Sequence, residues 1–408
     1  MSQDLSAPSH SAAGRKDRRV GMITYSFYES DNRVMRYAET LARRGDAVEV
    51  FALRRSPEMP REEIINGVRV FRIQTRFGKN DQSGAADFLW PLLRFLVVSS
   101  WWITRRHWRG RYDVVHVHNI PDFLVFAAWY PKLTGAKVIL DIHDIVPEFF
   151  GSKFGVSERS VTVRALKVVE KLSAAFANHV ILSNHLWLDK YTARSARPEK
   201  CSVFINHVDE RIFHPRPRSG SARRPVIMFP GGLQWHQGVD IAIHAFARLR
   251  QRLPNAEFHI YGDGNMKPKL VALAQELGLN GSVRFFNPLR LQQIADVMAE
   301  ADLGVVPKRA DSFGNEAYST KIMEFMSLGV PLVVSSTKID RYYFDDSVVR
   351  FFESGDAAAL AEAMCEVLSD DELRCGLVAR ASEYVTRQSW GNRQADYLRL
   401  VDSLCIRN

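Results

Sequence analysis

Two glutamates that lie eight positions apart, Glu316 and Glu324, offer the most informative chemistry in this 408-residue chain. Glu324 falls within a helix that we expect to end at Gly329, and the apolar run that follows predicts a buried strand. A carboxylate one turn inside such a helix could accept hydrogen bonds from a ribose. Glu316 precedes the helix, where it could reach a sugar. The alternative is that both are ordinary surface residues of a helix.

The start of the same helix predicts an anion site. Ser319 or Thr320 suits the N-cap position, where a hydroxyl accepts a backbone hydrogen bond. The free N–H groups and the dipole at a helix N-terminus attract anions. Lys321 lies in the first turn, within reach of the same anion.

Glycine-rich turns follow two of the expected strands. Gly231 and Gly232 follow one strand, Gly238 opens the next helix, and Gly262 follows a second strand. Because glycine has no Cβ, only such bare backbone comes close enough to bind a diphosphate.

Polar residues at the ends of two other strands predict a further set of contacts. His118 and Asn119 follow one strand and His143 follows the next. Strand ends face the ligand crevice of an open α/β sheet, so these side chains are candidates for substrate contact. His116 lies two residues before His118, and we expect it to pack inside the domain. We predict no metal site, since no third ligand lies at a suitable spacing.

Strands and helices alternate along the chain in two series, which predicts two Rossmann-like α/β domains that face each other across a cleft. The expected strands cover 19–24, 48–53, 68–73, 113–117, 137–142 and 179–183, then 225–229, 257–261, 282–286, 303–306 and 331–334. The expected helices include 31–44, 239–252, 266–277, 291–299 and 320–328. The segment 215–221, rich in Pro, Arg and Ser, is typical of a linker.

The segment around Glu316 and Glu324 resembles the Glu–seven residues–Glu motif of the family-four retaining glycosyltransferases, which have the GT-B fold. The glycine turns and the segments 204–209 and 326–331 resemble other motifs of that family. The resemblance implies that Glu316 contacts the donor sugar, that Glu324 holds the nucleotide ribose and that His143 lies near the reacting centre. It also implies a nucleotide-sugar co-substrate with no further cofactor, retention of anomeric configuration and no metal requirement.

On this basis we expect an N-terminal acceptor domain at 18–212 and a nucleotide-sugar domain at 222–388. The last helix, within 389–408, is expected to return to the first domain. Residues 1–17 are polar and lack the apolar core of a signal peptide, so we expect a disordered tail.

The chain departs from the family where the donor diphosphate binds. The family usually has an Arg directly after the glycine at 231 and a Lys directly before Gly238, whereas this chain has Gly232 and Gln237. Charge-assisted contacts to phosphate are the strong ones, so another cation is needed. The candidates are Lys308, Arg309 and Lys321. The alternative is that all three are surface residues.

The first turn also departs from the family. Residues 26–33 are bulky where the family often has paired glycines. Asn32 and Arg33 in this turn remain candidates for substrate contact, and Asn32 is assigned to the acceptor side.

Charge and tryptophan content suggest an additional surface. The net charge is +9, and residues 1–111 hold 20 Lys and Arg against 12 Asp and Glu. The apolar stretch 88–103 is too short to span a membrane comfortably and is interrupted by Arg94. With the basic residues at 105–111, it suits a helix in an anionic membrane interface. A buried helix of the first domain is the other interpretation, and ordinary solvated charge would also explain the excess.

We therefore expect a cytoplasmic hexosyltransferase, peripheral on the inner face of the membrane, that extends a glycan or lipid-linked acceptor in cell-surface polysaccharide synthesis. Four scattered cysteines fit a reducing compartment. The alternatives are a non-catalytic glycosyltransferase-like subunit and a nucleotide-sugar epimerase. A nicotinamide-linked dehydrogenase is disfavoured because no Gly-x-Gly-x-x-Gly follows the first strand. No nucleic-acid recognition motif is present, so nucleic acid is not an expected partner.

Overall fold

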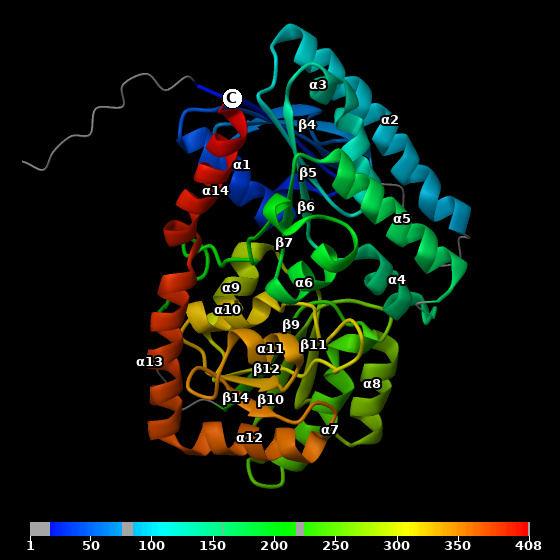
Figure 1. Cartoon of the computed structure of the whole chain (residues 1–408). Helices are drawn as coiled ribbons and strands as arrows, with labels where there is room; N and C mark the ends of the chain where they lie inside the picture. The colour runs from blue at the N-terminus through cyan, green and yellow to red at the C-terminus, as the bar shows by residue number, and fades with distance from the viewer. Residues whose placement is uncertain (1–16, 76–84, 158, 218–223, 407–408) are drawn as a thin grey trace, which may run out of the picture.

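The computed structural model describes residues 17–75, 85–157, 159–217 and 224–406. Two α/β domains lie one above the other, each with a central sheet covered by helices (Figure 1). This arrangement confirms the predicted pair of Rossmann-like domains. Most of the predicted tail, 1–17, and part of the predicted linker, 215–221, lie outside the described residues.

Within the described residues the first sheet has eight strands in the order β3-β4-β2-β1-β5-β6-β7-β8. They are β1 (Arg19–Thr24), β2 (Ala47–Arg54), β3 (Glu62–Ile65), β4 (Val68–Thr75), β5 (Val114–His118), β6 (Lys137–Ile142), β7 (His179–Leu182) and β8 (Cys201–Val203). All neighbours are parallel except β3 and β4. The sequence pattern missed β3 because it is mostly exposed, and missed β8 because it has three residues.

The helices of the first domain cover this sheet. They are α1 (Asn32–Arg43), α2 (Ala85–Arg109), α3 (Trp129–Leu133), α4 (Val146–Phe154), α5 (Val161–Phe176) and α6 (His185–Arg194), with 3-10 turns η1 (Tyr28–Ser30), η2 (Asp122–Ala128) and η3 (Pro198–Lys200). In α1 the side chains of Val34, Tyr37, Ala38 and Leu41 are buried against the sheet. Asp31 caps α1 by accepting from the Val34 N–H, which fixes where the helix starts.

The second sheet has six strands in the described residues, all parallel, in the order β11-β10-β9-β12-β13-β14. They are β9 (Val226–Pro230), β10 (Glu257–Tyr261), β11 (Val283–Phe286), β12 (Leu303–Val306), β13 (Leu332–Ser335) and β14 (Arg350–Phe352). The helices are α7 (Val239–Leu249), α8 (Lys267–Glu276), α9 (Leu291–Ala299), α10 (Thr320–Ser327), α11 (Lys338–Tyr343), α12 (Ala357–Ser369) and α13 (Asp371–Gln388), with the turn η4 (Trp235–Gln237). Every strand and helix expected in this half is present, with boundaries within about three residues.

The last helix, α14 (Trp390–Cys405), follows α13 and lies alongside α1 of the first domain (Figure 1). Its Tyr397 hydroxyl lies 3.0 Å from His116 Nδ1 beneath the first sheet. Trp390 donates from its indole N–H to the Thr40 hydroxyl at 2.9 Å. Chain segments from both ends of the sequence therefore build the first domain.

Candidate functional site

The glycine turns after β9 and β10 touch through their backbones. Gly231 has a φ of +132°, which disfavours any side chain, and its N–H donates to the Tyr261 carbonyl at 2.8 Å. The Leu233 N–H donates to the Asp263 carbonyl at 2.9 Å. A Cβ on Gly262 would collide with the Gly231 carbonyl. The two strand ends thus present bare backbone at the carboxyl edge of the sheet.

The N-terminus of α10 has no side-chain cap. Ser319 occupies the N-cap position as predicted, but its hydroxyl makes no capping bond. Ser319 is 7% exposed, and its Oγ has no hydrogen-bond partner among the described residues. Ser319 therefore takes the predicted N-cap position without making the expected capping bond. Thr320 is the first helical residue.

Two of the three candidate cations already have acidic partners. Lys308 is buried, pairs with Asp340 at 2.9 Å and donates to the Ala317 carbonyl at 2.7 Å. Arg309 pairs with both oxygens of Asp240, at 2.9 and 2.6 Å, and lies over the ring of Trp235. These contacts hold the loops after β9 and β12 and leave less of either charge for a ligand.

Lys321 is the third candidate, and it lies beside the glycine turn. Its Nζ donates to the amide oxygen of Gln237 at 3.1 Å and lies over the Phe229 ring, 5.3 Å from the centroid. A Cβ on Gly231 would collide with the Lys321 side chain. In the described part of the chain no carboxylate lies within ion-pair distance of Lys321. Burial, assisted by Lys308, lowers the pKa of Lys321 to about 8.

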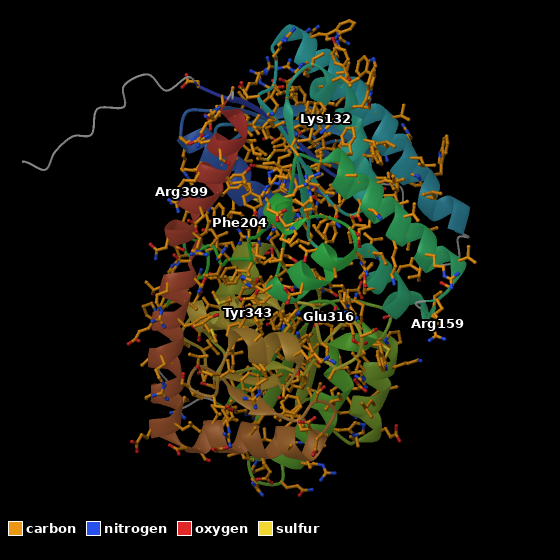
Figure 2. The ribbon with its side chains drawn as sticks, in the orientation of Figure 1. Lys132, Arg159, Phe204, Glu316, Tyr343 and Arg399 are labelled. Atoms are coloured by element: carbon orange, nitrogen blue, oxygen red, sulfur yellow. The ribbon has the colours of Figure 1, made fainter. Side chains whose placement is uncertain are left out.

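The two glutamates of the motif have different surroundings. Glu324 lies one turn into α10, where burial raises the pKa of its carboxyl while Lys321 and Thr320 oppose that shift. Glu316 lies in the loop before α10, at the junction of the domains (Figure 2). Its carboxylate is bound by Lys190, which comes from α6 of the first domain. Sequence reasoning did not single out Lys190.

His143 lies just beyond β6, and its imidazole rests on a buried polar cluster. Its Nε2 lies 3.2 Å from Asp141 Oδ2 and 3.2 Å from His118 Nδ1. Its backbone N–H donates to the Asn119 side-chain oxygen at 2.7 Å. His118 is fully buried and Asn119 is 5% exposed, which places them behind His143 rather than in open contact with an acceptor. Asn32 begins α1 and is half-exposed.

Asp141 is the residue of this cluster to which sequence reasoning assigned no role. It is fully buried in β6, and Arg33 donates to both of its oxygens, at 2.8 and 2.7 Å. Burial alone would raise the pKa of Asp141, but Arg33, His143 and His118 hold it well below its usual range. A carboxylate inside an otherwise apolar strand was the available signal, because such a group needs a partner.

The buried histidines also bear on metal binding. His116, His118 and Asp141 offer ligand atoms within 4.8 Å of one another. His116 stacks on His118, with ring centroids 4.2 Å apart, and bonds Tyr397, in line with its predicted structural role. Arg33 already neutralises Asp141, and its guanidinium would repel a second cation on the same carboxylate.

Comparison with known proteins identifies the family of this chain. Residues 30–207 match the model described as glycosyl transferase 4-like domain, and residues 213–384 match the model described as glycosyl transferases group 1. The chain belongs to the group 1 glycosyltransferases. The curated D-inositol 3-phosphate glycosyltransferase of Thermobispora bispora is 27% identical over 380 residues, which are 88% of this chain and 85% of that one. The phosphatidyl-myo-inositol mannosyltransferase of Mycolicibacterium smegmatis is 30% identical over 48% of each chain.

A solved structure supports the fold of this glycosyltransferase. The structure of HepE from Anabaena, in complex with UDP and glucose, superposes with a TM-score of 0.71 at 18% identity. The match covers 94% of this chain and 99% of that one. The predicted GT-B architecture is therefore confirmed.

The glycosyltransferase also exposes an unusual apolar surface on its first domain. An apolar stripe of exposed side chains runs along α2 and consists of Trp90, Leu93, Val97, Trp101 and Trp108. They recur every three or four residues up to Trp101, with a gap of seven before Trp108. On the other face of the helix, Phe95 and Ile103 are buried. Helix α2 therefore packs one face on the core of the first domain, as the buried-helix interpretation of 88–103 expected, and exposes tryptophans on the other. Contact with a membrane stays a prediction. No helix among the described residues is long and apolar enough to cross a membrane.

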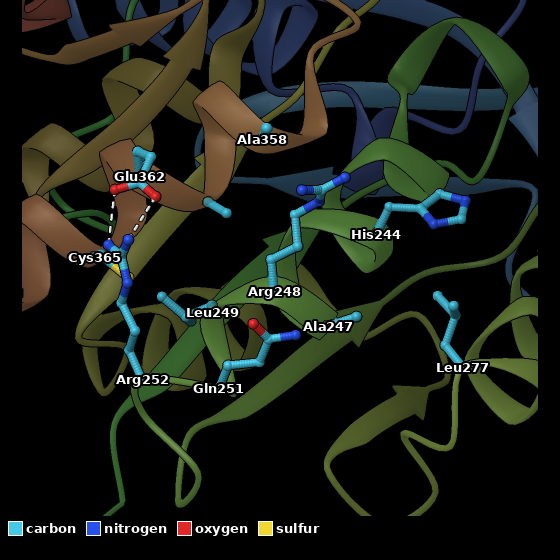
Figure 3. A pocket seen from close by; sticks show the side chains of 11 residues that line it. His244, Ala247, Arg248, Leu249, Gln251, Arg252, Leu277, Ala358, Glu362 and Cys365 are labelled. Carbon is cyan, nitrogen blue, oxygen red and sulfur yellow. Dashed lines mark hydrogen bonds and ion pairs between the residues drawn. The ribbon is translucent and has the colours of Figure 1, made fainter.

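Two pockets lie outside the donor and acceptor residues predicted from sequence. One, of about 610 Å³, follows the apolar stripe and is lined by Leu96, Val97, Ser100, Trp101, Thr104, Arg105, Trp108, Phe126 and Trp129. The other, of about 420 Å³, lies between α7, α8 and α12 (Figure 3). It is lined by the far half of α7, from His244 onward, whereas the glycine turn precedes the start of that helix. We assign no ligand to the second pocket.

Proposed function

We propose that this glycosyltransferase moves a hexose from a nucleotide-sugar donor to a glycan or lipid-linked acceptor, with retention and without a metal ion, in the synthesis of a cell-surface polysaccharide. The observation that carries the donor half is the start of α10. Ser319 has a buried hydroxyl without a partner among the described residues, and the half-buried Lys321, which has no carboxylate partner there, lies against the bare backbone of Gly231. Such groups are costly unless an anion binds them.

These groups suit a diphosphate leaving group. When the bond between sugar and diphosphate breaks, negative charge grows on the phosphate oxygens. Fixed N–H groups at a helix N-terminus and the Lys321 ammonium stabilise that charge without reorganising. Lys321 thereby replaces the cations that the chain lacks at Gly232 and Gln237. Glu324 lies one turn further along α10, and in this proposal it accepts hydrogen bonds from the ribose.

In this proposal Glu316 and His143 lie next to the donor sugar. Glu316 lies in the loop between β12 and α10 and accepts from sugar hydroxyls, while His143 lies at the carboxyl edge of the first sheet. The domains close around both substrates, which orients them and excludes water, a competing acceptor. Retention follows from the family resemblance, and the proposal assigns no step to a metal.

The names of the relatives and the apolar stripe support a lipid-linked or inositol-containing acceptor. One relative is named for inositol phosphate and another for phosphatidyl-myo-inositol. Eleven of the sixteen large apolar side chains that are exposed among the described residues lie on α2, α3 and α5. On α5, Val161, Val168 and Leu172 recur beside Arg164 and Lys171. Amphipathic helices with basic flanks bind anionic interfaces, so we infer peripheral contact with the inner face of the membrane.

Vesicle sedimentation tests the membrane contact. We expect the native chain to sediment with phosphatidylglycerol vesicles at low salt and to be released by salt. The double variant Trp101→Ser/Trp108→Ser should stay in the supernatant. Trp235→Ser removes a tryptophan of the second domain that is as exposed as Trp101, and it is the control. Equal sedimentation of all three proteins would remove the α2 surface from the proposal.

Detection of nucleoside diphosphate release tests the reaction. UDP-, GDP- and ADP-sugars are incubated with the native chain and with Glu316→Ala, with and without extracted membrane glycolipid. Release from one donor that glycolipid stimulates and the variant loses supports a transferase. Conversion of the donor sugar without acceptor supports an epimerase. Donor binding without any reaction favours a non-catalytic subunit.

A further inference from the structure

A cation from the first domain holds the carboxylate of Glu316 in the second. Lys190, in α6, donates to the two carboxylate oxygens at 2.8 and 2.6 Å. The lysine and glutamate side chains are 31% and 20% exposed, so the pair is partly screened from solvent. Because the partners belong to different domains, this ion pair exists only while the domains are in contact.

The start of the same helix binds the backbone of Glu316. Asn184 caps α6, since its side-chain oxygen accepts from the Trp187 N–H at 2.8 Å. Its side-chain nitrogen donates to the Glu316 carbonyl at 3.0 Å. Helix α6 therefore determines the position of both the backbone and the carboxylate of Glu316.

An aromatic residue of the same loop is inserted into the first domain. Phe313 is 7% exposed and belongs to the apolar core of the first domain, although it comes from the second. Its ring lies 5.5 Å from that of Phe149 in α4 and 6.4 Å from that of Trp187 in α6. Phe313 thus brings the loop close enough for Lys190 to reach Glu316.

Lys190 is itself held by a series of alternating charges. Its Nζ lies 3.8 Å from Glu148 in α4. Arg194 donates to Glu148 at 2.6 and 2.9 Å and to Glu170 in α5 at 2.8 and 2.6 Å. A lysine backed in this way loses less conformational freedom on pairing than an isolated surface lysine.

We propose that Lys190 is a positioning residue that orients the Glu316 carboxylate, so that the sugar contact of Glu316 is assembled only when the two domains close. The inference rests on the proposed function for its chemical meaning. Each carboxylate oxygen has two lone pairs, so one lone pair accepts from Lys190 while the second remains for a sugar hydroxyl. The lysine charge also compensates a carboxylate that would otherwise oppose an anionic donor.

Kinetics of sugar transfer provide the first test. Lys190→Met should lower kcat about 10- to 100-fold, because a displaced contact group costs that much in rate. Lys190→Arg should restore part of the loss, and nucleoside diphosphate affinity should stay unchanged in both variants. In a Glu316→Gln background, Lys190→Met should add less than about a twofold loss, since residues that act as a unit are not additive. Independent, additive losses would overturn the proposal.

Amide hydrogen exchange provides a test that does not depend on turnover. In Lys190→Met and in Phe313→Ala, exchange of residues 309–318 should become at least about fivefold faster, because the loop opens more readily from α6. Lys137→Met is the control, because Lys137 begins β6 and so lies at the amino end of the strand, away from the carboxyl edge of the sheet. Exchange of residues 309–318 should stay unchanged in this variant. Unchanged exchange in Lys190→Met would overturn the proposal even with a fully active enzyme. If exchange is faster in Lys190→Met but the native chain transfers no sugar, the contact between Lys190 and Glu316 is supported and the proposed function is rejected.

Discussion

The first domain surrounds the Asp141 carboxylate with partners. At the start of α10 in the second domain, by contrast, the described residues supply no partner for the Ser319 hydroxyl and no carboxylate for Lys321. Both Asp141 oxygens accept from Arg33, and the histidines His118 and His143 lie within hydrogen-bond distance. Ser319 has a buried hydroxyl with no partner among the described residues, and Lys321 has only the Gln237 amide oxygen.

This difference separates groups that position a site from groups that await a ligand. The Asp141 carboxylate is fully hydrogen-bonded, although Nε2 of His116 and of His118 has no partner among the described residues. A buried carboxylate held in this way is rigid, and it holds His143 in one orientation. An unsatisfied buried donor costs about 1–3 kcal/mol of folding free energy, which a bound anion offsets. Substitutions in the first cluster should therefore lower stability, and substitutions in the second should lower ligand affinity.

The largest expected effect is on the stability of the first domain. Asp141→Asn leaves the Arg33 guanidinium buried without its counter-charge, which should cost about 3–5 kcal/mol in urea unfolding. Asp240→Asn removes the partner of Arg309 in a more exposed pair and should cost about 1 kcal/mol or less. Equal losses in the two variants would contradict the view that the first cluster is the structural one.

The second effect is on nucleotide affinity. Lys321→Met removes a charge-assisted contact worth about 1.5–3 kcal/mol, so calorimetry should show nucleoside diphosphate binding about 10- to 100-fold weaker. Its unfolding free energy should be unchanged or higher, because the substitution removes a half-buried charge that has no carboxylate partner among the described residues. Lys269→Met in α8 is the matched control, and we expect native affinity. Native affinity in Lys321→Met would remove this lysine from the donor site.

The contrast between the clusters also explains what the sequence could predict. Apolar periodicity located the strands and helices because each element buries one face. Lys321 was a candidate because it lies in the first turn of a helix, a local feature. Asp141 and Arg33 are 108 positions apart and Lys190 and Glu316 are 126 apart. No local pattern predicts such pairs, since they depend on how α1, β6 and α6 are placed by the fold.

The pH dependence of nucleotide binding should be smaller but more specific. Burial lowers the pKa of Lys321 to about 8, and a bound diphosphate favours its charged form and raises that pKa. Binding therefore takes up a proton above pH 8, and affinity falls as pH rises. We expect about a tenfold loss between pH 7 and 9 from the fraction of charged lysine. Calorimetric titrations of Lys321→Met should be flat over this range, and a parallel decline would assign the effect to another group.

The smallest effect is expected at Ser319, whose hydroxyl has two explanations: it binds a phosphate, or it caps α10. If the hydroxyl awaits a phosphate, Ser319→Ala should weaken nucleoside diphosphate binding about fivefold, the value of one net hydrogen bond. The free protein should lose no stability, because the hydroxyl has no partner to lose. If it instead caps the helix in solution, the same variant should lose about 1 kcal/mol of stability and keep its affinity. Asn119→Ala, in the Asp141 cluster, should likewise lose stability and keep its affinity. It removes the side-chain oxygen that accepts from the His143 N–H and the nitrogen that donates to Asp122.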